Sequence, residues 1–136
     1  MRPITSITVH CSDTETGTVE AIRKYHVETK GWRDIGYHFV IYRDGSLHTG
    51  RPMYMSGAHC PETNMSGIGI CVIGKKAFEK KQLEMLEFVV KDLQSRFSIK
   101  EVRGHCDYPS AKRQKKSCPS PQIETFLKEK GLWKWI

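Results

Sequence analysis

The chain has 136 residues, of which 38% are hydrophobic and 27% charged, and its formal net charge is +7. This length suits one domain with its own hydrophobic core and is short for two, so we expect a single domain over residues 1–136. The sequence contains no apolar run of about 18 residues, which excludes a membrane-spanning helix.

The excess of basic residues is concentrated in two segments, Lys75–Lys81 and Lys112–Lys116. A basic surface attracts polyanions such as nucleic acids and teichoic acids. Few aromatic residues that could stack on bases are interleaved with these lysines and arginines. We therefore expect a solubilising surface, no specific nucleic-acid partner, and a monomer.

Five cysteines are an odd number, and their spacing is not that of a disulfide framework. We expect mostly reduced thiols in a protein made in the cytoplasm. The segment Met1–His10 has no apolar stretch of the kind found in secretory signals, because Arg2, Thr5 and Thr8 interrupt it. Synthesis without a signal peptide is therefore expected, with release or delivery to any target outside the cytoplasm.

The first third of the chain predicts a strand, a helix and a hairpin. Residues 4–9 are β-prone and lead into His10, which is expected at the end of a strand. Thr18 as N-cap and Gly31 as the stop signal delimit a helix of about three turns. The aromatic and β-branched residues 36–42 then lead through Asp44-Gly45 into residues 46–48, as in a β-hairpin.

The remainder predicts a central strand, a long helix, a short strand and a last helix. The apolar run Ile68–Gly74 is typical of a strand that is covered on both faces. Apolar residues between Phe78 and Phe97 recur at steps of three and four, as in an amphipathic helix. Residues 101–105 resemble a short strand, residues 106–120 a loop, and Ser120-Pro121 the start of a helix. Strands interspersed with helices indicate an α/β fold, a mixed sheet flanked by helices.

Two histidines and a cysteine are candidate metal ligands. His10 and His105 are each expected just past a strand end, and their wide separation is typical of an assembled metal site. Cys118 follows in the next loop. Zinc accepts imidazole nitrogen and thiolate sulfur, and three protein ligands leave a fourth position for water. With six histidines and five cysteines present, these residues on their own are one choice among many.

The other histidines and cysteines have simpler interpretations. His26 is expected as a surface or partly buried helix residue, and His38 should face the opposite side of the sheet from Tyr37. Cys11 and Cys106 should point away from the side that their histidine neighbours face. Like Cys60 and Cys71, they are expected to be packed or exposed thiols.

Several segments, in the same order along the chain, together resemble the type 2 N-acetylmuramoyl-L-alanine amidases, which share their fold with peptidoglycan-recognition proteins. The resemblance extends from about Ile7 to about Leu127, and matched blocks in register are stronger evidence than one motif. The matching blocks are Val9–Ser12, Gly31–Ile41, Arg43–Gly45, Gly50–Pro52, Gly57–His59, Ile68–Gly74, Gly104–His105 and Lys116–Ser120.

The resemblance implies a role for each matching residue. One Zn²⁺ ion would be bound by His10, His105 and Cys118. Tyr37 and Lys116 would be catalytic, with Lys115 as the alternative if the alignment is shifted by one residue. His59 and Asn64 would bind substrate.

The resemblance also implies the reaction. The enzyme would hydrolyse the amide bond between N-acetylmuramic acid and L-alanine in peptidoglycan. It would be a phage or prophage endolysin that reaches the bacterial cell wall, in the periplasm, after release or delivery.

Two other functions stay open at this point. One is a peptidoglycan-recognition module that binds muropeptide without cutting it, which would be distinguished by loss of the metal thiolate of Cys118. The other is a regulator that binds RNA polymerase or nucleic acid through its basic surface, and its binding to DNA would depend steeply on salt.

Overall fold

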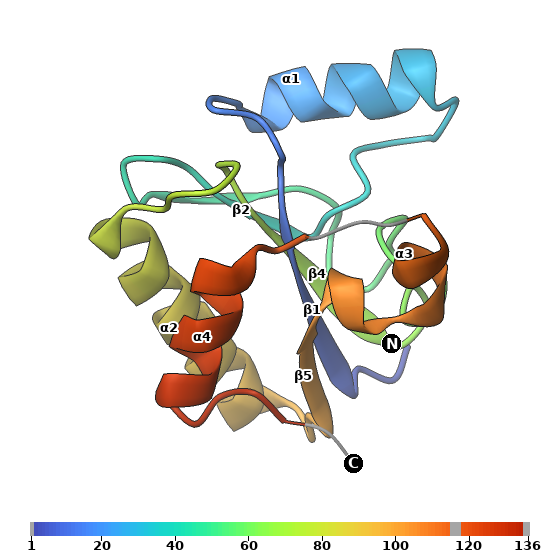
Figure 1. The fold of residues 1–136 in the computed structure, drawn as a ribbon. Coiled ribbons are helices and arrows are strands. Elements are labelled where there is room, and N and C mark those ends of the chain that lie inside the picture. The colour runs from blue at the N-terminus through green and yellow to red at the C-terminus, as the bar shows by residue number, and fades with distance from the viewer. Residues whose placement is uncertain (1, 115–117, 135–136) are drawn as a thin grey trace.

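The computed structural model describes residues 2–114 and 118–134, and its strands are interspersed with helices (Figure 1). A π-helical turn, η1, directly follows α1, and a 3₁₀ turn, η2, directly follows β5. The elements in chain order are β1 (Ser6–Cys11), α1 (Val19–Lys24), η1 (Tyr25–Thr29), β2 (Phe39–Ile41), β3 (Leu47–Thr49), β4 (Gly67–Val72), α2 (Lys80–Arg96), β5 (Glu101–Gly104), η2 (His105–Asp107), α3 (Pro109–Arg113) and α4 (Pro121–Glu129).

The strands of the described residues form one five-stranded sheet in the order β3-β2-β4-β1-β5. Strand β1 runs parallel to both β4 and β5, and β2 runs parallel to β4, whereas β3 pairs antiparallel with β2. The sheet is therefore mixed, and the predicted α/β fold is confirmed. Strand β4 is central and buried over its whole length, as its apolar sequence predicted.

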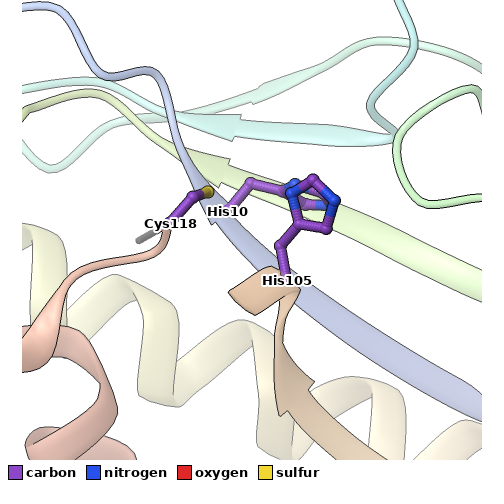
Figure 2. Close-up of side chains that lie close together, drawn as sticks. All are labelled: His10, His105 and Cys118. Atoms are coloured by element: carbon purple, nitrogen blue, oxygen red, sulfur yellow. The ribbon is translucent and has the colours of Figure 1, made fainter. Parts of the chain in front are cut away.

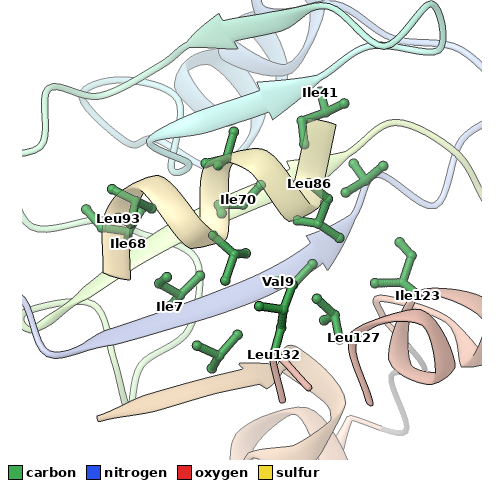
Figure 3. Packing of buried hydrophobic residues seen from close by; sticks show 14 of the residues in the cluster. Ile7, Val9, Ile41, Ile68, Ile70, Leu86, Leu93, Ile123, Leu127 and Leu132 are labelled. Carbon is green, nitrogen blue, oxygen red and sulfur yellow. The ribbon is translucent and has the colours of Figure 1, made fainter. Parts of the chain in front are cut away.

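The larger core lies on the face of the sheet that α2 and α4 cover (Figures 1 and 3). Ile7 and Val9 of β1 point into this core together with Leu86 of α2 and Leu127 of α4. Because side chains alternate along a strand, Thr8 and His10 point to the opposite face. This opposite face carries a smaller cluster of buried residues, formed by Val19, Ile35, Val40, Cys71 and Ile73.

Helix α2 confirms the long amphipathic helix, and its start is secured by side-chain hydrogen bonds. Glu79 and Gln82 form a capping box, in which each side chain accepts a hydrogen bond from the other residue's backbone amide. The predicted cap of the first helix is also present, because the Thr18 hydroxyl accepts a hydrogen bond of 3.1 Å from the amide of Ala21. None of the helices in the described ranges has the length and apolar character needed to cross a bilayer.

Three local predictions were wrong. Strand β1 continues through Cys11, so His10 lies inside the strand and not past its end. The segment predicted as a loop contains η2 and α3. Ser120 precedes α4, but its side chain makes no capping hydrogen bond to the described residues, and its φ of 112° is unlike that of an ordinary N-cap.

The unpredicted helix α3 makes hydrogen bonds to a distant loop at its first turn. The exposed carboxylate of Glu62 accepts hydrogen bonds from the amide of Ser110, at 2.9 Å, and from its hydroxyl, at 2.6 Å. These bonds satisfy a donor in the first turn, as a capping residue would. A partner 48 positions away cannot be recognised from the local sequence.

Candidate metal centre

The parallel pairing of β1 and β5 brings the two candidate histidines together. The register aligns Val9 with Gly104, so the residues that follow them, His10 in β1 and His105 directly after β5, are neighbours at the same edge of the sheet. Both side chains are buried, and their ring centroids are 4.5 Å apart. The 94 residues between them are thus bridged by one strand pairing.

Cys118 is held against the same edge by main-chain contacts. Its sulfur accepts a hydrogen bond of 2.8 Å from the amide of Cys11, and its carbonyl accepts one of 2.7 Å from the amide of Cys106. Gly104 makes this approach possible, because a Cβ atom there would lie 2.6 Å from Cδ of Pro119. The glycine before His105 therefore has a packing role in addition to its place in the strand.

The three residues form a cluster that could bind a metal ion (Figure 2). One ligand atom of each lies within 4.8 Å of the other two, with the histidines buried and the cysteine half-buried. Ligand atoms bound to one tetrahedral zinc ion lie about 3.3–3.8 Å apart, given bonds of about 2.0–2.3 Å. Two imidazoles and a thiol whose ligand atoms lie within 4.8 Å of one another therefore need only small shifts to bind one zinc ion.

Cys106 belongs to a different group. It lies with Asp107 and Glu124, again with potential ligand atoms within 4.8 Å of one another. Burial, and then the charges of these two carboxylates, raise the pKa of the Cys106 thiol to about 11. Cys11 and Cys71 point into the two hydrophobic clusters, as predicted for packed thiols, and Cys60 is also buried.

Tyr37, one of the two predicted catalytic residues, lies beside the cluster. Its ring centroid is 5.1 Å from that of His10, and its ring packs on the smaller hydrophobic cluster. Burial, and then the nearby sulfurs of Cys71, Cys118 and Cys11, raise the pKa of the Tyr37 hydroxyl well above 10. The hydroxyl therefore stays protonated at neutral pH and can act as a hydrogen-bond donor.

Lys116, the other predicted catalytic residue, and its alternative Lys115 lie outside the described residues. Their catalytic role stays a prediction.

His59 contacts the metal-site cluster directly. Its Nδ1 lies 2.9 Å from Nε2 of His10, with the two rings arranged edge to face. Burial, and then the neighbouring basic groups His38, His105, Arg2 and Arg51, lower the pKa of His59 well below its ordinary value. The ring is therefore neutral at physiological pH, and its substrate-binding role stays a prediction.

Asn64 supports the loop that carries His59. Its side-chain oxygen accepts hydrogen bonds from the amides of His59, at 2.8 Å, and Cys60, at 2.9 Å. These contacts are structural, and the predicted role of Asn64 in substrate binding also stays a prediction.

A residue that the sequence did not indicate, Arg2, connects the same loops. Its guanidinium donates hydrogen bonds to the carbonyls of Met53, Met65 and Gly67. Backbone acceptors leave no trace in the sequence of the partner segment, so no motif could have identified Arg2. Its contacts hold the segment between β3 and β4, which includes His59, against the start of the chain.

The remaining buried histidines have structural partners. His38 precedes β2, so the predicted alternation with Tyr37 does not apply; its ring lies 5.9 Å from that of His59. Its Nδ1 accepts a hydrogen bond from the amide of Gly69, and its Nε2 therefore donates to the carbonyl of Met55. His26 is more deeply buried than predicted and accepts a hydrogen bond from the amide of Gly36.

Comparison with known proteins supports the predicted family. The family described as N-acetylmuramoyl-L-alanine amidase matches residues 1–121. The endolysin of Enterobacteria phage K11 is 31% identical over 88% of this chain and 83% of its own length. The endolysin of Escherichia phage T7 is 30% identical over 93% of this chain and 87% of its own.

Solved structures agree with these sequence relationships. The N-acetylmuramoyl-L-alanine amidase LysC from Clostridium intestinale URNW superposes with a TM-score of 0.83 at 25% identity, covering 96% of this chain and 87% of that one. PGRP-SA of Apis mellifera shares the fold, with a TM-score of 0.84 at 24% identity over 98% of this chain and 86% of that one.

The fold and the family match define the class of protein. The chain belongs to the N-acetylmuramoyl-L-alanine amidase family, and the predictions of the family and of this type of enzyme are confirmed.

Proposed function

We propose that this protein is a zinc-dependent amidase that cleaves the bond between N-acetylmuramic acid and L-alanine in peptidoglycan. The observation that carries the proposal is the convergence of His10, His105 and Cys118, within 4.8 Å of one another, in a member of this amidase family. Three protein ligands with a fourth position for water or substrate are typical of catalytic zinc, whereas structural zinc sites usually have four protein ligands.

The donor set favours zinc over the hard cations magnesium and calcium, which prefer oxygen ligands. A zinc ion at this site would supply Lewis-acid chemistry, lowering the pKa of water to about 7 and polarising the scissile carbonyl.

The side chains of the protein would supply the rest of the chemistry. Hydrolysis of an amide places negative charge on the carbonyl oxygen, which needs hydrogen-bond donors positioned in advance. The Tyr37 hydroxyl, kept protonated by its raised pKa, is suited to this donation and poorly suited to giving up its proton. We assign two roles to Lys116: its ammonium group would be the second hydrogen-bond donor to the carbonyl oxygen, and it would protonate the leaving amine of L-alanine.

The similarity to phage endolysins supports a biological role in lysis. Two of the relatives are phage endolysins, and the chain covers more than four fifths of the length of each. We therefore propose a phage or prophage endolysin whose partner is the peptidoglycan of the bacterial cell wall.

The proposal is tested on purified sacculi, with and without a metal chelator. New free amino termini of L-alanine that fail to form in the presence of chelator are the expected products. New reducing sugar ends would instead mean a glycosidase. Binding to sacculi with no new ends of either kind would mean a recognition module.

A further inference from the structure

A third histidine lies against the metal-site cluster: His59 reaches His10 from the loop between β3 and β4. The distance of 2.9 Å between His59 Nδ1 and His10 Nε2 is that of a good hydrogen bond. His59 is not one of the three residues whose ligand atoms converge. Its contact is with a proposed ligand.

We infer that His59 is a positioning residue for the metal site, accepting a hydrogen bond from His10 and thereby selecting the His10 tautomer that binds metal. This inference rests on the proposed zinc site. A histidine that binds a metal ion through one ring nitrogen carries its proton on the other, and that N–H is usually held by a hydrogen-bond acceptor. His59 Nδ1 is placed as this acceptor for His10 Nε2, which assigns metal binding to Nδ1 of His10.

The position of the His59 ring is tightly constrained. A Cβ atom at Gly69 would lie 2.6 Å from Cγ of His59, and one at Gly57 would lie 2.4 Å from its Cδ2. Two glycines on different segments therefore leave a slot that the imidazole fills. A ring held in this way keeps its Nδ1 directed at His10.

The backbone of His59 is constrained as well. Asn64 accepts the amide hydrogens of His59 and Cys60 with one side-chain oxygen, and its own carbonyl accepts a hydrogen bond of 2.9 Å from Gly57. Asn64 thus fixes the short turn from which His59 projects. The support of the site extends from Asn64 through His59 to His10.

The burial of His59 distinguishes this role from direct substrate binding. Only 9% of the residue is exposed, which leaves little surface for a muropeptide to contact. A substrate-binding histidine would affect the Michaelis constant and leave zinc affinity unchanged. A positioning histidine would affect zinc affinity in the absence of any substrate.

The test measures zinc affinity by competition with a chelating dye, together with the visible spectrum of the cobalt-substituted protein. His59→Leu removes the acceptor, whereas His59→Asn keeps an oxygen near the place of Nδ1. We expect His59→Leu to weaken zinc binding by about 10- to 100-fold and to shift the cobalt spectrum, and His59→Asn to restore most of the affinity. Thermal unfolding of the metal-free variants reports whether each is folded.

His26→Asn is the matched control, because His26 is also buried and its Nδ1 also accepts a hydrogen bond, in this case from the amide of Gly36. It should leave zinc affinity unchanged. If His59→Leu does not fold, Asn64→Ala should weaken zinc binding, and Asn64→Asp, which keeps an acceptor oxygen, should weaken it less.

Wild-type zinc affinity in folded His59→Leu, or equal losses in His59→Leu and His59→Asn, would overturn the positioning role. Failure of the wild-type protein to bind one zinc ion would instead overturn the proposed function.

Discussion

The amide of Cys11 donates a hydrogen bond of 2.8 Å to the sulfur of Cys118, although 107 positions separate the two residues. The bond joins the end of β1 to the segment before α4, and the same segment packs on Gly104 at the end of β5. An amide donor directed at sulfur stabilises a thiolate, the form in which cysteine binds metal. The backbone of one proposed ligand strand thus helps to place the third ligand.

Cys118→Ser should abolish both stoichiometric zinc binding and amidase activity, because a hydroxyl is a much poorer zinc ligand than a thiolate. Cys106→Ser is the matched control and should retain both properties. Zinc content after gel filtration and release of L-alanine amino termini from sacculi are the measurements. Zinc lost from Cys106→Ser and kept by Cys118→Ser would reverse the ligand assignment.

Tyr37→Phe should lower kcat by about 100-fold or more, as expected when one donor to the oxyanion is lost. Zinc affinity should stay at the wild-type level, because Tyr37 packs on His10 through its ring, which phenylalanine retains. Steady-state kinetics on a soluble muropeptide, combined with zinc titration, separates the two effects. An unchanged kcat would remove Tyr37 from the catalytic residues.

Gly69→Ala should destabilise the metal-free protein by about 1–3 kcal/mol, the usual cost of overpacking a filled core. The added methyl group would meet the ring of His59, with Cβ 2.6 Å from Cγ. The cost should therefore be much smaller in a His59→Ala background, where the ring is absent. Denaturant unfolding of the four proteins of this double-mutant cycle measures the coupling, and strictly additive costs would contradict the contact.

The metal-free protein should lose stability as the pH falls from about 6.5 to about 4. Burial lowers the pKa of His38 from 6.5 to about 4, against the opposing effect of the hydrogen bond to the Met55 carbonyl, and the charges of Arg2 and Arg51 add smaller lowering effects. Protonation therefore favours the unfolded chain: the contribution of neutral His38 is complete above about pH 6.5 and is lost by about pH 4. At about 1.4 kcal/mol per pKa unit, the loss is on the order of 3 kcal/mol.

Denaturant unfolding of the wild type and of His38→Asn, at several pH values and with chelator present, tests this prediction. The variant should be less stable at neutral pH and should show a shallower dependence on pH. Parallel curves for the two proteins would mean that His38 does not titrate in this range.

Gln82→Leu should destabilise the protein by about 1–3 kcal/mol, because it leaves buried groups without hydrogen bonds. The fully buried Gln82 donates a bond of 2.7 Å to the carbonyl of Ile73 and accepts one from the amide of Glu79. Glu84→Gln, on the same helix, removes only an exposed ion pair of 3.8 Å with Lys80 and should cost less than about 0.5 kcal/mol. Equal effects in chemical denaturation would contradict the assigned role of Gln82.

The sequence by itself determined the α/β class, the central apolar strand and the long amphipathic helix. It also determined the first helix and the hairpin. These features depend on local periodicity, on caps such as Thr18 and on turn residues such as Asp44-Gly45. The family resemblance, carried by short blocks in a constant order, was also readable in the sequence. The extent of β1 and the presence of α3 were not.

Only the tertiary structure decided which side chains meet. His10 and His105 are neighbours because β1 and β5 pair in parallel with a particular register, and neither segment by itself shows that the other is its partner. The first turn of α3 is hydrogen-bonded to Glu62, and the ring of His59 that contacts His10 fills a slot between glycines from two segments. Such contacts arise when distant parts of the chain pack together, because burial brings into contact groups that the sequence keeps apart.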